Sequence, residues 1–356
     1  ILSLISDAGT PSLSDPGRLL IEACIEKNIK VIPIPGASSI TASMSISGFK
    51  DQFLFYGFLP KTEKELEKIL SSLSQLSFSQ VFFIPSIKIN FYLKKFKQFF
   101  SGRKILIAKE LTKLHETFLR EDVDKINMFK TSIKGELTVV ISEKNIKDKF
   151  FDEEKIIKYL NEGKILSLIS DAGTPAISDP GRLLIQTCVE KGIKVIPIPG
   201  VSSVVASMSI SGFNDQFLFY GFLPKTEKEL EKILSSLCQY SFSQVFFIPA
   251  IKVNFYIKKF KKFFSGRKIM IAKEITKLHE SFYREDIDEI KLFKTSFKGE
   301  LTIVISEKKI KDKFFNEIEV IRKAKMYLKK YSLKDVVELL FESEKINKKK
   351  IYQICL

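Results

Sequence analysis

The second half of the chain alternates helical and strand-like hydrophobic patterns. Residues Asp152–Glu162 have apolar positions at helical spacing and predict a helix. The short apolar runs Ile165–Ser170 and Lys194–Ile198 predict two buried parallel strands. Between the runs, Asp179 is the expected N-cap of a helix that reaches about Lys191. Ser202 is the expected N-cap of another helix, which ends at Gly212. This alternation predicts a parallel sheet flanked by helices.

The residues that follow predict a mixed α/β unit and a helical tail. Strands are expected at Phe217–Leu223, Gln244–Ile248, Lys268–Glu274, Ser281–Glu285 and Glu300–Ser306. Helices are expected at Glu227–Ser241 and Val253–Ser265, and in the tail at Asn316–Lys330, Leu333–Ser343 and Lys345–Cys355. The tail is rich in lysine, and its composition fits either a nucleic-acid-binding module or a solvated cap.

Most of this pattern occurs twice. Ile1–Phe151, the first repeat, recurs as Ile165–Phe315, the second repeat. A period of this length indicates duplication of whole domains, not a solenoid. We expect partial N-terminal domains at 1–50 and 152–214, C-terminal mixed α/β domains at 51–151 and 215–315, and a basic helical tail at 316–356.

Composition narrows the class of protein. The chain has 356 residues and a net charge of +16, which suits a polyanionic partner, although a lysine-rich codon bias explains it equally well. The sequence has no apolar run long enough for a membrane helix. Its four cysteines lack metal-binding spacing, and with only two histidines it predicts no metal site. We expect reduced thiols and a cytoplasmic location.

Two loop motifs stand where ligands bind in open α/β sheets. SDAGTPAISDPG at Ser170–Gly181 has its twin SDAGTPSLSDPG at Ser6–Gly17, and PIPGVSS at Pro197–Ser203 has its twin PIPGASS at Pro33–Ser39. Each loop follows a predicted strand, so two adjacent loops would shape one crevice. The alternative is that each is only a capped strand-to-helix turn.

Two further motifs carry ionisable groups. KEITKLHE at Lys273–Glu280 has its twin KELTKLHE at Lys109–Glu116, and KGELTIVIS occupies Lys298–Ser306. The histidine of the first motif could serve acid–base chemistry near neutral pH. A structural histidine at a strand end is the alternative. Our candidates for catalysis are Lys273, His279, Glu280, Lys109, His115 and Glu116.

Taken in order, these blocks together with FLFYGFLPK resemble the ribosomal RNA small subunit methyltransferase I family. The resemblance implies the tetrapyrrole methylase fold, a class III S-adenosylmethionine-dependent methyltransferase. It also implies S-adenosyl-L-methionine as cofactor and methylation of a cytidine 2′-hydroxyl in small-subunit ribosomal RNA. By resemblance, Thr276 lies with the KLHE residues on the substrate side. The expected cofactor-binding residues are Asp171, Ala172, Gly173, Thr174, Pro199, Gly200 and Ser202, with Asp7, Ala8, Gly9, Thr10, Pro35, Gly36 and Ser38 in the first repeat.

The chain departs from the family at three places. Neither repeat shows the family's first strand with its TPIGN-type loop, nor the E-D-T-R segment. The E-S-P-H-R stretch reads Ile248–Lys252 (IPAIK) and Ile84–Lys88 (IPSIK). The junction at Phe150–Lys155 indicates an unequal crossover, and we expect the parent product to carry a complete unit upstream of Ile1.

These departures leave alternatives open. The chain could be a non-catalytic RNA-binding or structural remnant, or a methyltransferase for a small molecule such as a tetrapyrrole. Its repeats could pack together as an intramolecular pseudo-dimer, or the chain could form a homodimer.

Overall fold

The computed structural model describes residues 2–6, 9–34, 36–111, 116–130, 135–144, 154–170, 173–179, 181–198, 200–275, 277, 279–294, 299–308, 317–328, 331–344 and 352. The chain divides into two compact units, Ile1–Lys308 and Lys309–Leu356. None of the described helices is both long and apolar enough to cross a membrane.

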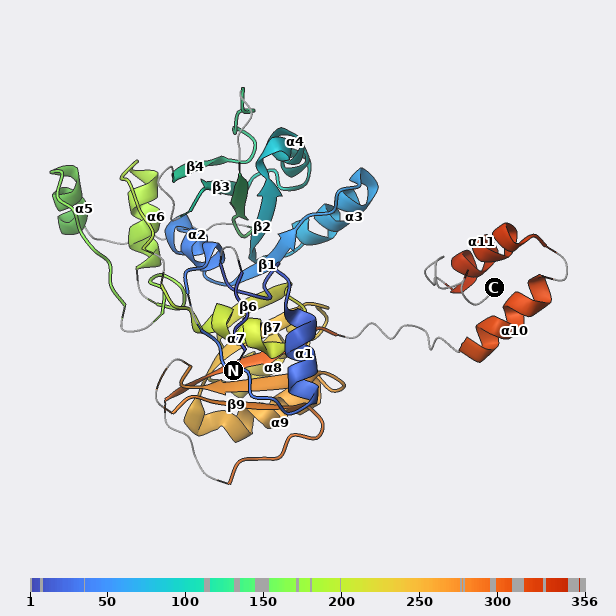
Figure 1. Ribbon diagram of the computed structural model, residues 1–356. Coiled ribbons are helices and arrows are strands. Elements are labelled where there is room, and N and C mark those ends of the chain that lie inside the picture. The colour runs from blue at the N-terminus through green and yellow to red at the C-terminus, as the bar shows by residue number, and fades with distance from the viewer. Residues whose placement is uncertain are drawn as a thin grey trace. The chain divides into compact units, whose positions relative to one another are not determined.

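The first unit is built on one ten-stranded mixed sheet with the order β4-β3-β5-β2-β1-β6-β7-β10-β8-β9 (Figure 1). Its strands are β1 Phe53–Phe58, β2 Ser79–Pro85, β3 Lys104–Lys109, β4 Thr117–Asp122, β5 Glu136–Ile141, β6 Phe217–Phe222, β7 Ser243–Pro249, β8 Lys268–Lys273, β9 Ser281–Asp286 and β10 Glu300–Ile305. The five strands predicted in the second repeat are therefore confirmed to within one or two residues at each end.

Helices pack on both faces of the sheet, whereas α5 lies away from it (Figure 1). The helices of this unit are α1 Arg18–Glu26, α2 Ser39–Ser47, α3 Glu63–Ser74, α4 Ile89–Phe99, α5 Glu154–Asn161, α6 Arg182–Glu190, α7 Ser203–Ser211, α8 Glu227–Leu237 and α9 Val253–Phe263, with short 3-10 turns η1 Ser86–Lys88 and η2 Ala250–Lys252. One core joins α3, α4, α8 and α9 to one face of the strands. A second core joins α2 and α7 to the other face. Alternate strand residues supply the two cores, as the period of a strand requires.

The repeats meet at the centre of the sheet. β1 and β6 hold equivalent sequences and pair antiparallel, with Phe53 opposite Phe219 and Phe55 opposite Phe217. The rings of Phe53 and Phe219 have centroids 5.6 Å apart, and those of Phe55 and Phe217 also lie 5.6 Å apart. Each repeat contributes five of the ten strands, so the two repeats share a single hydrogen-bonded sheet.

Helices from one repeat also pack on the other. α1 of the first repeat contacts α7, and α6 of the second repeat contacts α2. Each approach passes over the glycine that ends a helix, in the left-handed conformation. A Cβ at Gly48 would lie 2.9 Å from the Gln186 Cα, and one at Gly212 would lie 3.1 Å from the Ile25 Cδ1. Glycine is therefore required at Gly48 both for its backbone angle and for space.

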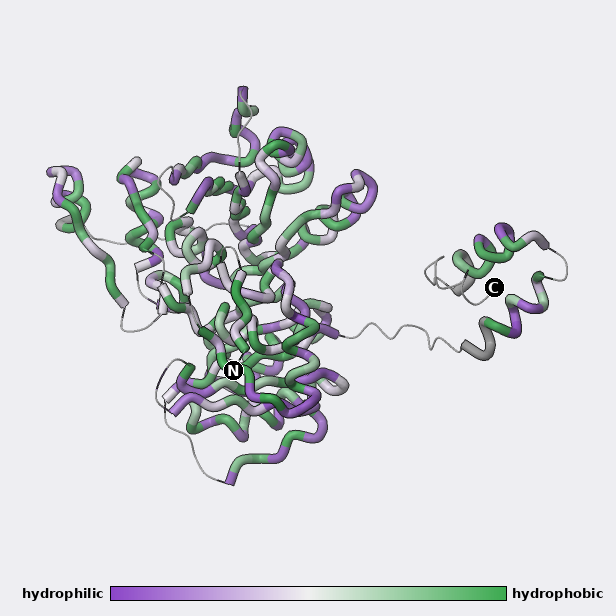
Figure 2. The backbone as a smooth tube through the Cα atoms, in the orientation of Figure 1, coloured by the Kyte–Doolittle hydropathy of each residue, from purple (hydrophilic) through white to green (hydrophobic). Residues whose placement is uncertain are grey.

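The two strands predicted at Ile165–Ser170 and Lys194–Ile198 are wrong. Both segments are irregular, and so are residues 2–6 and 30–34, which correspond to them in the first repeat. Ile165 is 96% exposed and Ile169 is 83% exposed. The segment after α5 is largely hydrophobic and lies away from the sheet (Figures 1 and 2). A strand needs a neighbour for its backbone groups, and among the described residues neither segment is paired with one.

The helix predicted to begin at Asp179 also needs correction. Its N-cap is Gly181, and the helix α6 runs over Arg182–Glu190. Gly181 has a φ of 114°, and a Cβ there would lie 2.5 Å from the Leu168 Cδ2. The positive φ favours glycine at the cap, and the helix begins two residues later than predicted. By contrast, Ser202 and Gly212 occupy the N-cap and C-cap positions of α7 as predicted, although the Ser202 side chain makes no capping hydrogen bond there with the described residues.

The second unit contains two packed helices, α10 Glu317–Tyr327 and α11 Leu333–Glu344. Their small core consists of Ala324, Val336, Val337 and Leu340. Ser332 begins α11, because its Oγ accepts a hydrogen bond from the Asp335 amide at 3.3 Å. Of the third predicted tail helix at Lys345–Cys355, only Tyr352 lies within the described residues.

Candidate functional site

The SDAGTP loop of each repeat contains a buried hydroxyl group without a partner. Thr10 is 9% exposed and Thr174 is 6% exposed. The Oγ1 atom of each side chain is buried and makes no hydrogen bond within the described part of the chain. A buried polar group without a partner is destabilising and needs an explanation. Two equivalent hydroxyls in equivalent loops fit a bound group that would supply the missing partner.

The glycine that precedes each of these threonines is open on the side where a side chain would lie. Gly9 and Gly173 precede the threonines with φ of 74° and 77°, and a Cβ on either would meet no atom within 4 Å. In the second repeat the PIPG loop joins this space, because a Cβ at Gly200 would lie 4.0 Å from the Gly173 carbonyl oxygen. The structure thus brings together the two loops that the sequence placed in one crevice.

The remaining predicted loop residues fall into two groups. Ser38 is buried and caps α2 by accepting a hydrogen bond from the Ile40 amide at 3.3 Å. Ser202 occupies the same place before α7 and is also buried. Gly36 has open space around it. The other predicted cofactor residues, Asp7, Ala8, Pro35, Asp171, Ala172 and Pro199, lie outside the described residues.

The KLHE candidates differ in exposure. Lys109 and Lys273 end β3 and β8 and are half-buried, as are Glu116 and Glu280. His279 is exposed to solvent. His115 and Thr276 lie outside the described residues. An exposed histidine at a loop fits neither a buried structural role nor a shielded base.

The residue after each strand-ending lysine was missed by the sequence analysis. Glu110 and Glu274 adopt left-handed backbone conformations, with φ of 49° and 48°. Such conformations in non-glycine residues carry strain and are concentrated at functional sites. A Cβ at Gly135 would lie 3.8 Å from the Glu110 Oε1, so this carboxylate approaches the KGE motif. No sequence pattern signals a positive φ at glutamate.

The altered IPSIK and IPAIK stretches lie at the same end of the sheet. The Ser86 amide donates to the Gly135 carbonyl at 3.1 Å, and the Ala250 amide donates to the Gly299 carbonyl at 2.9 Å. β3 and β8 end beside these contacts, because Lys109 pairs with Leu137 and Lys273 pairs with Leu301. In each repeat, the KE residues at the end of the strand, the Gly-Glu pair at 135–136 or 299–300 and the IPxIK stretch therefore form one loop cluster. Among the described residues, no three His, Cys, Asp or Glu side chains are grouped so as to hold a metal ion.

The chain is similar to several known proteins. The tetrapyrrole (corrin/porphyrin) methylase family matches residues 138–291. The ribosomal RNA small subunit methyltransferase I of Rickettsia prowazekii is 35% identical over 209 residues, which cover 57% of this chain and 74% of the relative. The protein of the same name from Buchnera aphidicola is 31% identical over 258 residues, which cover 69% of this chain and 89% of the relative. Among solved structures, the methyltransferase CobJ is 15% identical with a TM-score of 0.34, over 43% of this chain and 69% of that protein.

Proposed function

This chain belongs to the ribosomal RNA small subunit methyltransferase I family, and from this we propose that it methylates the ribose 2′-hydroxyl of a cytidine in small-subunit ribosomal RNA. The methyl donor is S-adenosyl-L-methionine. The observation that carries the proposal is the pair of unpartnered hydroxyls of Thr10 and Thr174, in the loops that resemble the family's cofactor loops.

The described residues fit this cofactor. When bound, S-adenosylmethionine supplies an electrophilic methyl group on its sulfonium sulfur. A threonine hydroxyl both donates and accepts, so Thr10 and Thr174 can bond to the cofactor's polar groups. Gly9 and Gly173 leave room for a ligand to approach the backbone. Methyl transfer to a hydroxyl depends mainly on alignment of donor and acceptor, so these loops must hold the cofactor rigidly.

The charge of the chain supports an RNA substrate. The net charge of +16 favours association with phosphates. Lys94 of α4 and Lys258 of α9 are exposed. Lys95 and Lys259, by contrast, are held in ion pairs with glutamates of α3 and α8. The exposed lysines can contact the RNA backbone, and the paired ones fix the helices that carry them.

A second candidate function is RNA binding without methyl transfer. The observation that favours it is the irregular, exposed state of the segments before both SDAGTP loops, such as Ile165–Ser170. A loop that is not anchored on a strand is positioned less firmly than one in a complete sheet. Such a chain would bind RNA with a steep dependence on salt and would have no affinity for the cofactor.

The decisive experiment is transfer of a radiolabelled methyl group from S-adenosylmethionine to small ribosomal subunits that lack the modification. The proposal expects label in a single ribose 2′-oxygen, mapped by mass spectrometry of nuclease fragments. The double variant Thr10→Val with Thr174→Val is the matched control and should incorporate little label. Salt-sensitive RNA binding without label in the wild-type chain would instead support the second candidate.

A further inference from the structure

Each SDAGTP loop is held by an aspartate from the other repeat. The Ser14 amide and Oγ donate to the Asp215 Oδ2 at 3.0 and 3.4 Å. Reciprocally, the Ser178 amide and Oγ donate to the Asp51 Oδ2 at 3.1 and 3.4 Å. Asp51 and Asp215 hold equivalent positions just before β1 and β6. The same serine–aspartate contact therefore occurs twice, and each time it joins the loop of one repeat to the aspartate of the other.

The loop needs such support because its backbone is strained. Ser12 and Ser14 have φ of 69° and 57°, and Ala176 and Ser178 have φ of 65° and 58°. Left-handed conformations in non-glycine residues persist only where surrounding contacts enforce them. In each loop the aspartate accepts the amide hydrogen of one such residue. A charged acceptor makes a stronger hydrogen bond than a neutral one.

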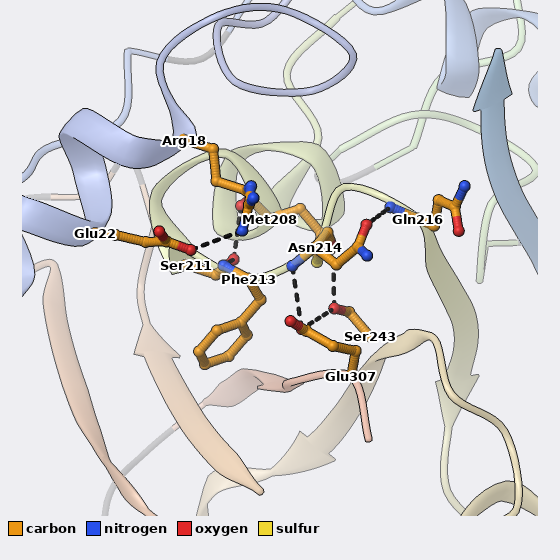
Figure 3. Close-up of polar contacts among 9 residues, drawn as sticks. All are labelled: Arg18, Glu22, Met208, Ser211, Phe213, Asn214, Gln216, Ser243 and Glu307. Carbon is orange, nitrogen blue, oxygen red and sulfur yellow. Dashed lines mark hydrogen bonds and ion pairs between the residues drawn. The ribbon is translucent and has the colours of Figure 1, made fainter. Parts of the chain in front are cut away.

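The turn that carries each aspartate is itself anchored. The Asn214 amide donates to the Glu307 Oε2 at 3.1 Å, and the Asn214 carbonyl accepts from the Ser243 Oγ at 3.0 Å (Figure 3). In the first repeat, the Lys50 amide donates to the Glu143 Oε2 at 3.1 Å. The turns after α2 and α7, which carry the aspartates, are thus held in place by hydrogen bonds.

The held serines lie close to the threonines of the proposed cofactor site. The Leu13 amide donates to the Thr10 carbonyl at 3.4 Å, and the Ile177 amide donates to the Thr174 carbonyl at 3.3 Å. On the other side, a Cβ at Gly57 would lie 2.8 Å from the Ser14 Oγ. Ser14 is therefore enclosed between β1 of its own repeat and Asp215 of the other.

The two loops differ at one position. In the first repeat, the Ser12 Oγ donates to the Ser209 carbonyl of α7 at 2.6 Å. Ala176 stands at the equivalent position in the second repeat and has no hydroxyl. Among the described residues, the first loop therefore has a hydroxyl contact to the other repeat that alanine cannot make at the equivalent position of the second loop. The loop with Ala176 can therefore be compared with the loop with Ser12 in the same molecule.

We propose that Asp215 and Asp51 are positioning residues that each order the cofactor loop of the opposite repeat. Neither touches the reacting atoms. As a consequence, a cofactor site is complete only when the other repeat is folded against it. This inference rests on the proposed function for its link to the cofactor, whereas the crossed ordering of the loops stands on the contacts alone.

The test is hydrogen exchange with mass spectrometry on the full chain carrying Asp215→Ala or Asp51→Ala. The two loops differ in sequence at Ser12 and Leu13 against Ala176 and Ile177, so their peptides are separable by mass. We expect Asp215→Ala to speed exchange in the peptide containing Ser14 by about tenfold, the size set by loss of a charge-assisted hydrogen bond. Asp51→Ala should act on the peptide containing Ser178, and more strongly, because Ala176 gives no second contact. Faster exchange only in the substituted repeat, or no change, would overturn the proposal.

Asn variants separate positioning from general destabilisation. Asp215→Asn keeps an acceptor but loses the charge, so exchange should fall between the wild type and Asp215→Ala. If Asp215→Ala fails to fold, this intermediate rate decides the question, and wild-type exchange in Asp215→Asn contradicts the proposal. Peptides from β3 and β5 are the internal control and should be unchanged.

A cofactor titration completes the test. S-adenosylhomocysteine should bind about tenfold more weakly at one site of Asp51→Ala, with recovery in Asp51→Asn. Equal affinity at both sites despite faster loop exchange would overturn the positioning role. If the wild-type chain does not bind S-adenosylhomocysteine, the proposed function fails, and the crossed exchange pattern still decides whether the aspartates order the loops.

Discussion

Leu54 and Leu218, which hold the same position in the two repeats, lie directly opposite each other in the β1–β6 pair. Both side chains are almost wholly buried in the same core. The pairing register is symmetric about these residues, because Phe53 faces Phe219 and Phe55 faces Phe217. A self-complementary contact of this kind is what a two-fold symmetric dimer interface contains, here formed within one chain.

This relationship predicts strong coupling between the two leucines. Leu54→Ala and Leu218→Ala should each lower the free energy of unfolding by about 2–5 kcal/mol, as expected for a core truncation. Since the residues are direct neighbours, the double variant should depart from additivity by about 0.5–3 kcal/mol. Urea unfolding of the wild type, the two single variants and the double variant measures this coupling free energy. Additive effects would contradict a shared core across β1 and β6. Ile105→Ala with Ile269→Ala is the control pair and should be additive, since these buried residues lie on β3 and β8, near opposite ends of the sheet.

The unpartnered hydroxyls predict that stability and binding change independently. Thr174→Val replaces a buried hydroxyl that has no partner by a methyl group, so the thermal midpoint should stay the same or rise. The affinity for S-adenosylmethionine should fall at that site. Differential scanning calorimetry and ligand titration measure the two quantities. Thr187→Val is the matched control, because the Thr187 Oγ1 already donates to the Leu183 carbonyl at 3.0 Å.

Two half-buried tyrosines predict a loss of stability in alkaline solution. Burial raises the pKa of Tyr56 and of Tyr220, against a smaller lowering by side-chain hydrogen bonds with Gln216 and Gln52 of the other repeat. A raised pKa in the folded state favours the protonated form. Their stabilising effect is thus complete below the ordinary tyrosine pKa of about 10 and decreases as the pH rises above it.

Unfolding measured from pH 8 to pH 11 should show this decrease. The double variant Tyr56→Phe with Tyr220→Phe should lose less stability over the same interval. If the free energy of unfolding decreased equally with pH in the wild type and the double variant, the two tyrosines would not be the cause of the decrease. Ultraviolet absorbance of the folded wild type should show a group of tyrosines that ionise later than the rest.

The exposed isoleucines before the SDAGTP loops predict that the protein tends to self-associate through this apolar surface. Ile5 is 84% exposed and Ile169 is 83% exposed. Contiguous exposed apolar residues promote association. Ile5→Lys with Ile169→Lys should reduce aggregation and binding of a hydrophobic dye, while the thermal midpoint stays within a few degrees. Light scattering and dye fluorescence measure the effect. A large fall in the thermal midpoint would mean that these side chains are packed in solution.

Much of the fold could be predicted from the sequence where local pattern and tertiary environment agree. β6 and β10 are apolar runs with buried neighbours on both sides, and the predicted strands match them. Ile165–Ser170 has the same apolar character, but the prediction failed because a strand also requires a partner, and periodicity contains no information about partners. Asp179 failed as a cap because the helix begins two residues later, after Gly181, whose positive φ favours glycine.

The site was predicted in part. The sequence placed Thr174 and Gly200 in adjacent loops, and the structure joins these loops. It gave no sign of the roles of Asp51 and Asp215. Two nearly identical repeats leave open whether a residue contacts its own loop or the equivalent loop of the other repeat, and only the three-dimensional arrangement separates the two. The strained Glu274 was missed because a positive φ follows from tertiary contacts.

Calorimetric titration of the whole chain with S-adenosyl-L-methionine tests the central claim most directly. The account predicts saturable binding in the micromolar range that is lost in the double variant Thr10→Val with Thr174→Val. A folded wild-type sample that releases no heat of binding would contradict the account.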